Sequence, residues 1–227
     1  MSGRTALVTG GNRGIGLEVA RQLVGDGWSV WLTARDEAKA AKAARDVGEG
    51  ARPLGLDIDD ADSVRDALGR VGEAGPLHAL INNAAIDYDR DQRARSADLV
   101  RARRIMETNL FGTWTVAQAA APLLGREDHA VMVNVSSEAG SLGHMTPEAP
   151  AYSASKAALN ALTLMLAAEL RGQGTLVNAV CTGWTATEMG GGGRPVPDGA
   201  RSVVWGATLG PDGPTGGFFR DGERLPW

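Results

Sequence analysis

Short apolar stretches alternate along the chain with longer stretches in which apolar residues recur every three or four positions. The short stretches are typical of buried strands, and the longer ones are typical of helices with one buried face. The pattern predicts strands at 5–9, 28–33, 52–56, 78–81, 129–135, 175–180 and 217–219. It predicts a first helix that follows the glycine-rich turn after the first strand and ends near Gly25. Further helices are predicted at 36–47, 60–71, 97–124, 151–171 and 200–209.

Strands that alternate with helices predict a parallel sheet with helices on both faces. No linker interrupts the pattern, so residues 1–227 are predicted to form a single α/β domain with a doubly wound parallel sheet. Ligands bind such sheets at the carboxyl ends of the strands. Polar or glycine-rich clusters follow several predicted strands, at 10–16, 82–85 and 136–140.

The first predicted strand runs directly into Gly10-Gly11-Asn12-Arg13-Gly14-Ile15-Gly16, and a helix follows. This order aims backbone N–H groups and a helix N-terminus at a phosphate, and glycines let the phosphate approach the backbone closely. A glycine turn alone is also compatible with a plain strand–helix connection. Its place at the start of an alternating chain favours a dinucleotide site.

Composition and charge exclude several classes of function. A formal net charge of −4 argues against a protein that binds a nucleic-acid backbone. The single cysteine, Cys181, excludes an internal disulfide and a cysteine-based metal cluster. We find neither a secretory signal nor an apolar run long enough to span a membrane. We therefore expect a cytoplasmic protein with no metal and no membrane or nucleic-acid partner.

Tyr152 and Lys156 stand four residues apart at the start of a predicted helix, so their side chains share one face. A free phenol has a pKa of about 10 and is a poor acid–base catalyst at neutral pH. A nearby ammonium favours the phenolate and lowers that pKa. Taken alone, however, the pair is also common in ordinary helices.

With these residues in view, the chain resembles the short-chain dehydrogenase/reductase family over nearly its whole length. The motifs that carry the resemblance are Thr9-Gly10-x-x-x-Gly14-x-Gly16, Asn82-Asn83-Ala84-Ala85, Asn109, Ser137 and Tyr152-x-x-x-Lys156, in the family's order. Stretches 6–16, 32–36 and 213–227 are more weakly similar to the carbonyl reductases of that family.

The resemblance implies an enzyme that reduces ketones or aldehydes to alcohols. Tyr152 would protonate the carbonyl oxygen as hydride arrives from a nicotinamide. Lys156 would lower the pKa of Tyr152 and bind the nicotinamide ribose. Ser137 would hold the substrate oxygen, and Asn109 would position a water that links Lys156 to solvent.

The resemblance also implies which residues contact the cofactor. The predicted set is Thr9, Gly10, Asn12, Arg13, Gly14, Ile15, Gly16, Arg35, Asp57, Ile58, Asn83, Ala84, Tyr152, Lys156, Thr182, Gly183, Thr185 and Thr187.

We expect NADP(H) rather than NAD(H) as the cofactor. NAD-specific sites place a carboxylate after the second strand to bind the ribose 2′-hydroxyl, and here that position is Arg35. Arg13 is expected to reach the same 2′-phosphate. Asp36 is the counterargument: it either caps the next helix or touches the ribose, and capping is preferred. Asp57 should meet the adenine edge.

Some features depart from the family. Thr182-Gly183 stands where the family usually has Pro-Gly, and the 15 positions from Ser137 to Tyr152 lack the long insertion of many carbonyl reductases. The shorter segment leaves helices 97–124 and 151–171 uncovered, which predicts a homodimer or homotetramer. The glycine-rich segment 189–199 is expected to be a mobile lid, its two prolines blocking regular structure.

Two other functions fit the same residues. One is a non-catalytic NADP(H)-binding sensor on this fold, and the other is an NAD-dependent alcohol dehydrogenase that works in the oxidative direction. The intact set of Asn109, Ser137, Tyr152 and Lys156 favours an enzyme. No motif identifies the carbonyl substrate, the stereochemistry or the physiological direction.

Overall fold

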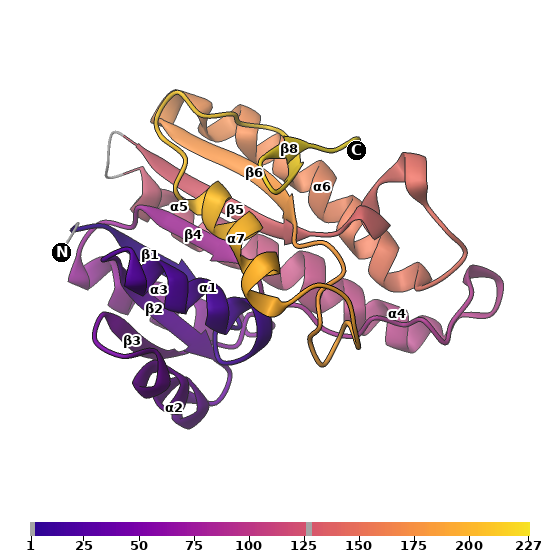
Figure 1. Cartoon of the computed structure of the whole chain (residues 1–227), viewed down its shortest axis with the longest axis horizontal. Helices are drawn as coiled ribbons and strands as arrows, with labels where there is room; N and C mark the ends of the chain where they lie inside the picture. Colours follow the sequence, from indigo (N-terminus) through magenta and orange to yellow (C-terminus); the bar gives the residue numbers. More distant parts are fainter. Residues whose placement is uncertain (1–2, 126–128) are drawn as a thin grey trace.

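A single sheet of eight strands forms the centre of the computed structural model, which describes residues 3–125 and 129–227 (Figure 1). The strand order is β3-β2-β1-β4-β5-β6-β7-β8, parallel from β3 to β7, with β8 antiparallel to β7. The strands are β1 (Thr5–Val8), β2 (Ser29–Ala34), β3 (Ala51–Gly55), β4 (Ala79–Asn82), β5 (Ala130–Ser136), β6 (Thr175–Cys181), β7 (Phe218–Arg220) and β8 (Glu223–Arg224). The predicted doubly wound parallel sheet is confirmed.

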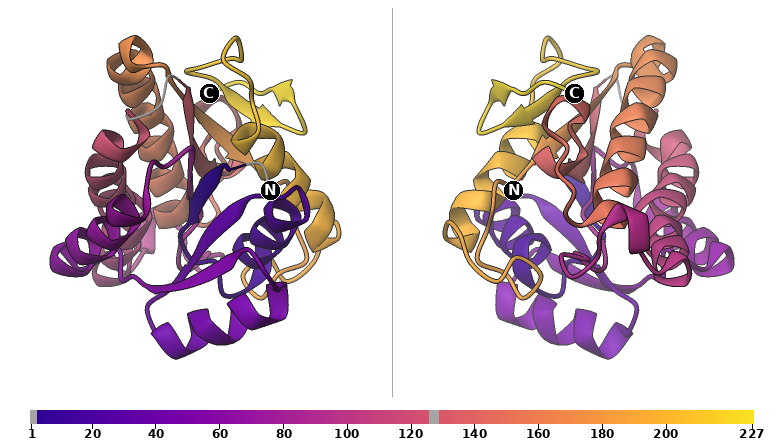
Figure 2. Two further views of the ribbon diagram at one scale, coloured as in Figure 1. Left: turned by 90° about the vertical axis from the view of Figure 1, so that its left-hand side faces the viewer. Right: turned by 90° about the vertical axis from the view of Figure 1, so that its right-hand side faces the viewer.

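Helices cover both faces of this sheet (Figure 2). Those on one face are α1 (Gly14–Gly25), α2 (Glu37–Val47) and α7 (Val196–Ala207), whose apolar residues share one core cluster. Those on the other are α3 (Ala61–Ala74), α5 (Thr113–Leu124) and α6 (Pro150–Leu170), with α4 (Leu99–Met106) beside α6. Short 3₁₀ turns lie at η1 (Ala94–Ser96), η3 (Glu138–Gly140), η4 (Leu142–His144) and η5 (Arg171–Gln173).

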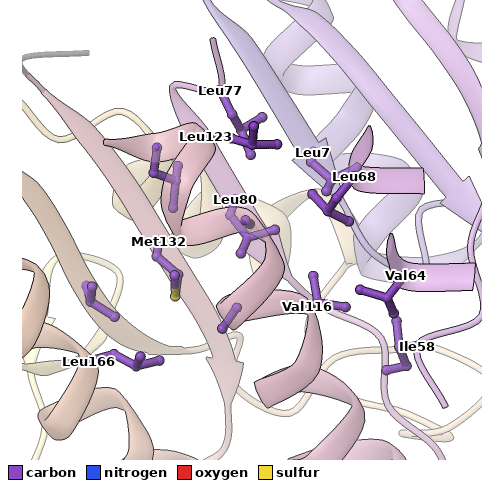
Figure 3. Close-up of a cluster of buried hydrophobic side chains, with 14 of the residues drawn as sticks. Leu7, Ile58, Val64, Leu68, Leu77, Leu80, Val116, Leu123, Met132 and Leu166 are labelled. Carbon is purple, nitrogen blue, oxygen red and sulfur yellow. The ribbon is translucent and has the colours of Figure 1, made fainter. Parts of the chain in front are cut away.

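Each face of the sheet has its own hydrophobic core. Successive side chains of a strand point to opposite faces, so Leu7 of β1 belongs to the cluster with α3, α5 and α6, while Val8 belongs to the cluster with α1, α2 and α7. Figure 3 shows Leu7, Leu80 and Met132 of the sheet among side chains of the first cluster. Burial on both faces explains why the central strands are apolar throughout rather than alternating.

The structure corrects three details of the predicted elements. Strand β8 was missed because it has only two residues, both of them exposed. The predicted helix 97–124 consists of α4, a π-helical turn η2 (Glu107–Gly112) and α5. The last helix begins at Val196, after Pro195 and with Pro197 in its first turn. Prolines suit that position, so these two begin regular structure instead of blocking it.

Buried polar side chains tie the central strands to α6. Asn82 Nδ2 donates to Asn134 Oδ1 at 2.9 Å, and Asn134 Nδ2 donates to Thr163 Oγ1 of α6 at 2.9 Å. Ser136 Oγ donates to Asn160 Oδ1 of the same helix at 2.6 Å. Because an unpaired polar group is costly in a low-dielectric interior, these bonds fix how α6 is set on the sheet.

Candidate active site

A cavity of about 1050 Å³ lies at the carboxyl ends of the strands. Its walls come from the turns after β1 to β6, which a doubly wound sheet brings to one edge. Most of the predicted site residues line it: Gly10, Asn12, Arg13, Gly14, Ile15, Arg35, Asp57, Ile58, Asn83, Ala84, Ser137, Tyr152, Lys156, Thr182, Gly183, Thr185 and Thr187. The other three predicted site residues, Thr9, Gly16 and Asn109, are not part of this lining and lie behind it.

Thr9 and Gly16 shape the glycine turn from behind. The Thr9 hydroxyl accepts hydrogen bonds from the backbone N–H groups of Asn83 (2.9 Å) and Ala84 (3.0 Å), which joins the turn after β1 to the turn after β4. A Cβ on Gly16 would lie 2.5 Å from both Asn83 Nδ2 and the Gly10 carbonyl oxygen. Only glycine therefore fits at position 16.

The glycine turn leaves a helix N-terminus open to the cavity. Gly10 and Gly14 have φ of 63° and 55°, a region that glycine adopts without strain. Helix α1 begins at Gly14, and no side chain caps its N-terminus at Arg13. Its first backbone N–H groups are thus available to an anion. This geometry fits the pyrophosphate of a dinucleotide.

Asn109 connects three segments around the site. It is fully buried in the π-helical turn η2. Its Oδ1 accepts from the backbone N–H of Ile86 at 2.8 Å, and its Nδ2 donates to the Ile86 carbonyl and to Ser155 Oγ, each at 3.2 Å. The π-turn, a feature frequent at functional sites, thus holds the loop after β4 against α6. The predicted water at Asn109 stays a prediction.

Lys156 is buried beside the end of β5. Its Nζ donates to the Val135 carbonyl at 2.8 Å and lies 5.6 Å from the centre of the Tyr152 ring. Burial disfavours the ammonium and lowers the pKa of Lys156 to about 8. Burial therefore makes Lys156 a stronger acid than an exposed lysine.

Tyr152 lies at the inner end of the cavity, edge-on to Tyr88 with 4.8 Å between ring centres. Burial raises the pKa of its phenol above the ordinary value, as does the nearby Cys181, whereas the hydrogen bond with Ser137 lowers it. The net direction is opposite to the one expected from Lys156. A phenol with a raised pKa keeps its proton, as a general acid requires before transfer.

Asp89 is a site residue that the sequence did not reveal. Its carboxylate is buried and accepts from the backbone N–H groups of Ala151 (3.1 Å) and Tyr152 (3.0 Å) at the start of α6. The helix has no cap of its own, because Ala149 at the N-cap has no polar side chain. No local pattern could have shown this contact, since cap and helix lie more than 60 positions apart.

The described residues form neither a metal site nor a membrane span. Within residues 3–125 and 129–227, no three His, Cys, Asp or Glu side chains come together as a metal site would need. No helix in those ranges combines the length and the apolar character needed to cross a bilayer. The cytoplasmic location stays a prediction from the sequence.

Comparisons with known proteins agree with this geometry. The family model for the short chain dehydrogenases matches residues 4–195. A carbonyl reductase [NADPH] 3 of Mus musculus is 32% identical over an alignment of 281 residues that covers 99% of this chain and 98% of the relative. A galactitol 2-dehydrogenase (L-tagatose-forming) of Cereibacter sphaeroides is 33% identical over 190 residues, 83% of this chain and 74% of the relative.

A solved structure extends the likeness to three dimensions. The NADPH-bound carbonyl reductase from chicken fatty liver superposes with a TM-score of 0.89 at 28% identity, over 99% of this chain and 94% of that one.

Removal of the Asp89 carboxylate should impair both stability and turnover. Asp89→Ala leaves two buried N–H groups at the start of α6 without an acceptor, which should lower the free energy of unfolding by about 1–3 kcal/mol. Because one of them belongs to Tyr152, kcat should also fall. Urea denaturation and steady-state kinetics measure the two effects.

The matched control is Asp60→Ala, which removes the cap of α3 at Asp62 and Ser63. It should cost about 1 kcal/mol and leave kcat unchanged. Asp89→Asn keeps one acceptor oxygen and should restore part of both losses. Equal kcat values for Asp89→Ala and Asp60→Ala would contradict a positioning role for Asp89.

Proposed function

Because this chain belongs to the short-chain dehydrogenase family, we propose that it is an NADPH-dependent reductase of ketone and aldehyde carbonyls. One observation carries the proposal: the centre of the Tyr152 ring is 5.6 Å from the Lys156 ammonium, in a cavity that Ser137 also lines and that extends to the glycine turn. A proton donor and a dinucleotide cradle in one cavity are what carbonyl reduction needs.

A nicotinamide dinucleotide, when bound, supplies the hydride that reduces the carbonyl carbon. The Ser137 hydroxyl, which lines the same cavity as Tyr152, donates a hydrogen bond to the carbonyl oxygen and stabilises the negative charge that develops there. Tyr152 transfers its phenolic proton to the same oxygen. The Lys156 ammonium then stabilises the phenolate that remains.

The charges at the other end of the cavity support NADPH over NADH. Arg35 and Lys39 line the cavity where the ribose 2′-phosphate is expected. Asp36, the carboxylate that could instead bind a 2′-hydroxyl, caps α2 by accepting from the Ala38 N–H at 2.9 Å. Arg13 is ion-paired with Glu188, and both side chains are exposed. A 2′-phosphate would take the place of that carboxylate.

We also propose that the enzyme is a homodimer or homotetramer. Three elements on one side of the sheet, α4, η2 and α6, expose large apolar side chains. These are Leu99 and Val100 of α4, Phe111 of η2, and Leu164 and Met165 of α6. Met165 is 55% exposed and Phe111 is 48% exposed. Apolar side chains gathered on neighbouring helices are typical of an interface.

Tyr152→Phe should separate catalysis from binding. The variant loses the proton donor and keeps the ring, so turnover with a panel of ketones, aldehydes and quinones should fall about 100-fold or more. The dissociation constant of NADPH should stay close to wild type. Tyr88→Phe removes the other phenol of the cavity and should keep most of the activity. Tight NADPH binding by a wild-type protein that turns over no carbonyl would favour a sensor instead.

Replacement of Arg13 and Arg35 by glutamine should reduce the preference for NADPH. Each guanidinium–phosphate contact is worth about 1.5–3 kcal/mol, so the loss of two should lower the ratio of kcat/KM for NADPH to that for NADH at least about 100-fold. The control is Arg45→Gln with Arg103→Gln, which changes the net charge equally at exposed positions outside the cavity. An unchanged ratio in the Arg13 and Arg35 double variant would show that the cofactor assignment is wrong.

Light scattering at micromolar concentration should give the mass of a dimer or tetramer. A charge inserted into the apolar face, by Phe111→Glu with Met165→Glu, should shift the mass toward the monomer because a buried unpaired carboxylate is costly. Exposed Leu142, which lies outside that face, provides the control Leu142→Glu. A wild type with the mass of a monomer would contradict the proposal.

A further inference from the structure

Arg90 lies on the rim of the cavity, in the loop between β4 and α4. Its guanidinium carbon is 5.7 Å from the centre of the Tyr88 ring and 5.5 Å from that of Trp184. Tyr88 in turn packs on Tyr152, at 4.8 Å between ring centres. A guanidinium held by two aromatic rings is fixed in place by cation–π attraction. It therefore has a defined position one aromatic ring away from the proposed proton donor.

Apart from Arg35, which lies where the ribose 2′-phosphate is expected, the other arginines around the cavity have carboxylate partners. Arg13 pairs with Glu188, Arg101 with Asp87 and Asp91, Arg194 with Asp221, and Arg220 with Glu138. Arg90 differs from them: among the residues that the structure describes, no carboxylate lies within ion-pair distance of its guanidinium.

Glu138, the acidic residue at the substrate end of the cavity, does not pair with Arg90. Glu138 lines the cavity after β5, and its carboxylate is bound by Arg220 and lies 3.8 Å from the Cys181 thiol. Besides Lys156, which donates to the Val135 carbonyl, Arg90 is the cation at the substrate end that has no carboxylate partner in the described part of the chain. The two rings near it can cover a carbon skeleton.

We infer that the substrate is a carbonyl compound that carries a carboxylate, and that Arg90 binds this carboxylate. The inference rests on the proposed reductase function and names its substrate class. A planar guanidinium binds a carboxylate through two parallel hydrogen bonds, which adds direction as well as energy. Tyr88 and Trp184 both lie beside the guanidinium, so an aromatic or flat skeleton would fill the space toward Tyr152.

The test compares substrates that differ only in charge. The probes are para- and meta-acetylbenzoate and the matching acetylbenzamides, which are uncharged and of nearly the same shape. For at least one position, kcat/KM of the wild type should be about tenfold or more higher for the carboxylate, since a hydrogen bond to a charged group is worth that much. Added salt should reduce this preference, because the contact is at the exposed rim.

Arg90→Gln should lower kcat/KM for the preferred acetylbenzoate about tenfold and leave the acetylbenzamide close to wild type. Arg90→Lys keeps the charge without the two-pronged geometry, so its kcat/KM for the acetylbenzoate should lie between those of the wild type and Arg90→Gln. Arg95→Gln is the control, because Arg95 is exposed on the turn that follows the same loop and lies outside the cavity. It should leave both substrates unchanged.

The alternative is that Arg90 only joins the loops that carry Tyr88 and Trp184. In that case Arg90→Gln would lower kcat/KM equally for the carboxylate and the amide, and the inference would be wrong. Equal values for the two substrates in the wild type, or no effect of Arg90→Gln, would overturn it as well.

A binding measurement keeps this test independent of turnover. Titration calorimetry of the acetylbenzoates and acetylbenzamides into the protein saturated with NADP⁺ should show the same tenfold preference and the same loss in Arg90→Gln. If the carboxylate binds preferentially but neither it nor any other carbonyl of the panel is reduced, Arg90 still recognises the anion and the reductase function is wrong. If no acetylbenzoate binds more tightly than its amide, the inference about Arg90 fails.

Discussion

The site depends on how firmly α6 is attached to the sheet through buried polar bonds. The helix meets β5 at Asn134–Thr163 and Ser136–Asn160, and Lys156 itself donates to the carbonyl of Val135. Apolar packing alone would let a helix shift along its groove at low cost, whereas each of these bonds has one partner and one geometry. The side chains of Tyr152 and Lys156 therefore meet the carboxyl ends of the strands at a fixed depth and rotation.

The same burial that fixes the helix also acts on its titratable groups. Loss of solvent disfavours both the phenolate of Tyr152 and the ammonium of Lys156, so the pKa of the first rises and that of the second falls to about 8. The hydrogen bond from Ser137 works against this trend at the phenol. The sequence indicated only the attraction between the two charges. The depth at which they are buried, which reverses the direction for Tyr152, depends on the surrounding chain.

Most of the fold and the centre of the site could be predicted from local sequence patterns. The glycine turn, the Tyr152–Lys156 spacing and the Asp36 cap each depend on residues a few positions apart, which sequence periodicity and capping rules describe. Asp89 and Arg90 contribute through contacts across the fold, and nothing in their neighbourhoods marks them. The π-helical turn at Asn109 was missed for a related reason: one extra residue in a helical turn leaves no trace in an apolar pattern.

Residues 88–90 are consecutive, yet they serve the active site from two sides. Tyr88 and Arg90 line the cavity, while Asp89 between them is turned into the protein, where it holds the first N–H groups of α6. Surface loops commonly vary in length between related proteins. A one-residue insertion or deletion here would exchange the inward and outward positions, placing a carboxylate in the cavity and leaving the helix uncapped. The spacing of these three residues is therefore constrained from both directions.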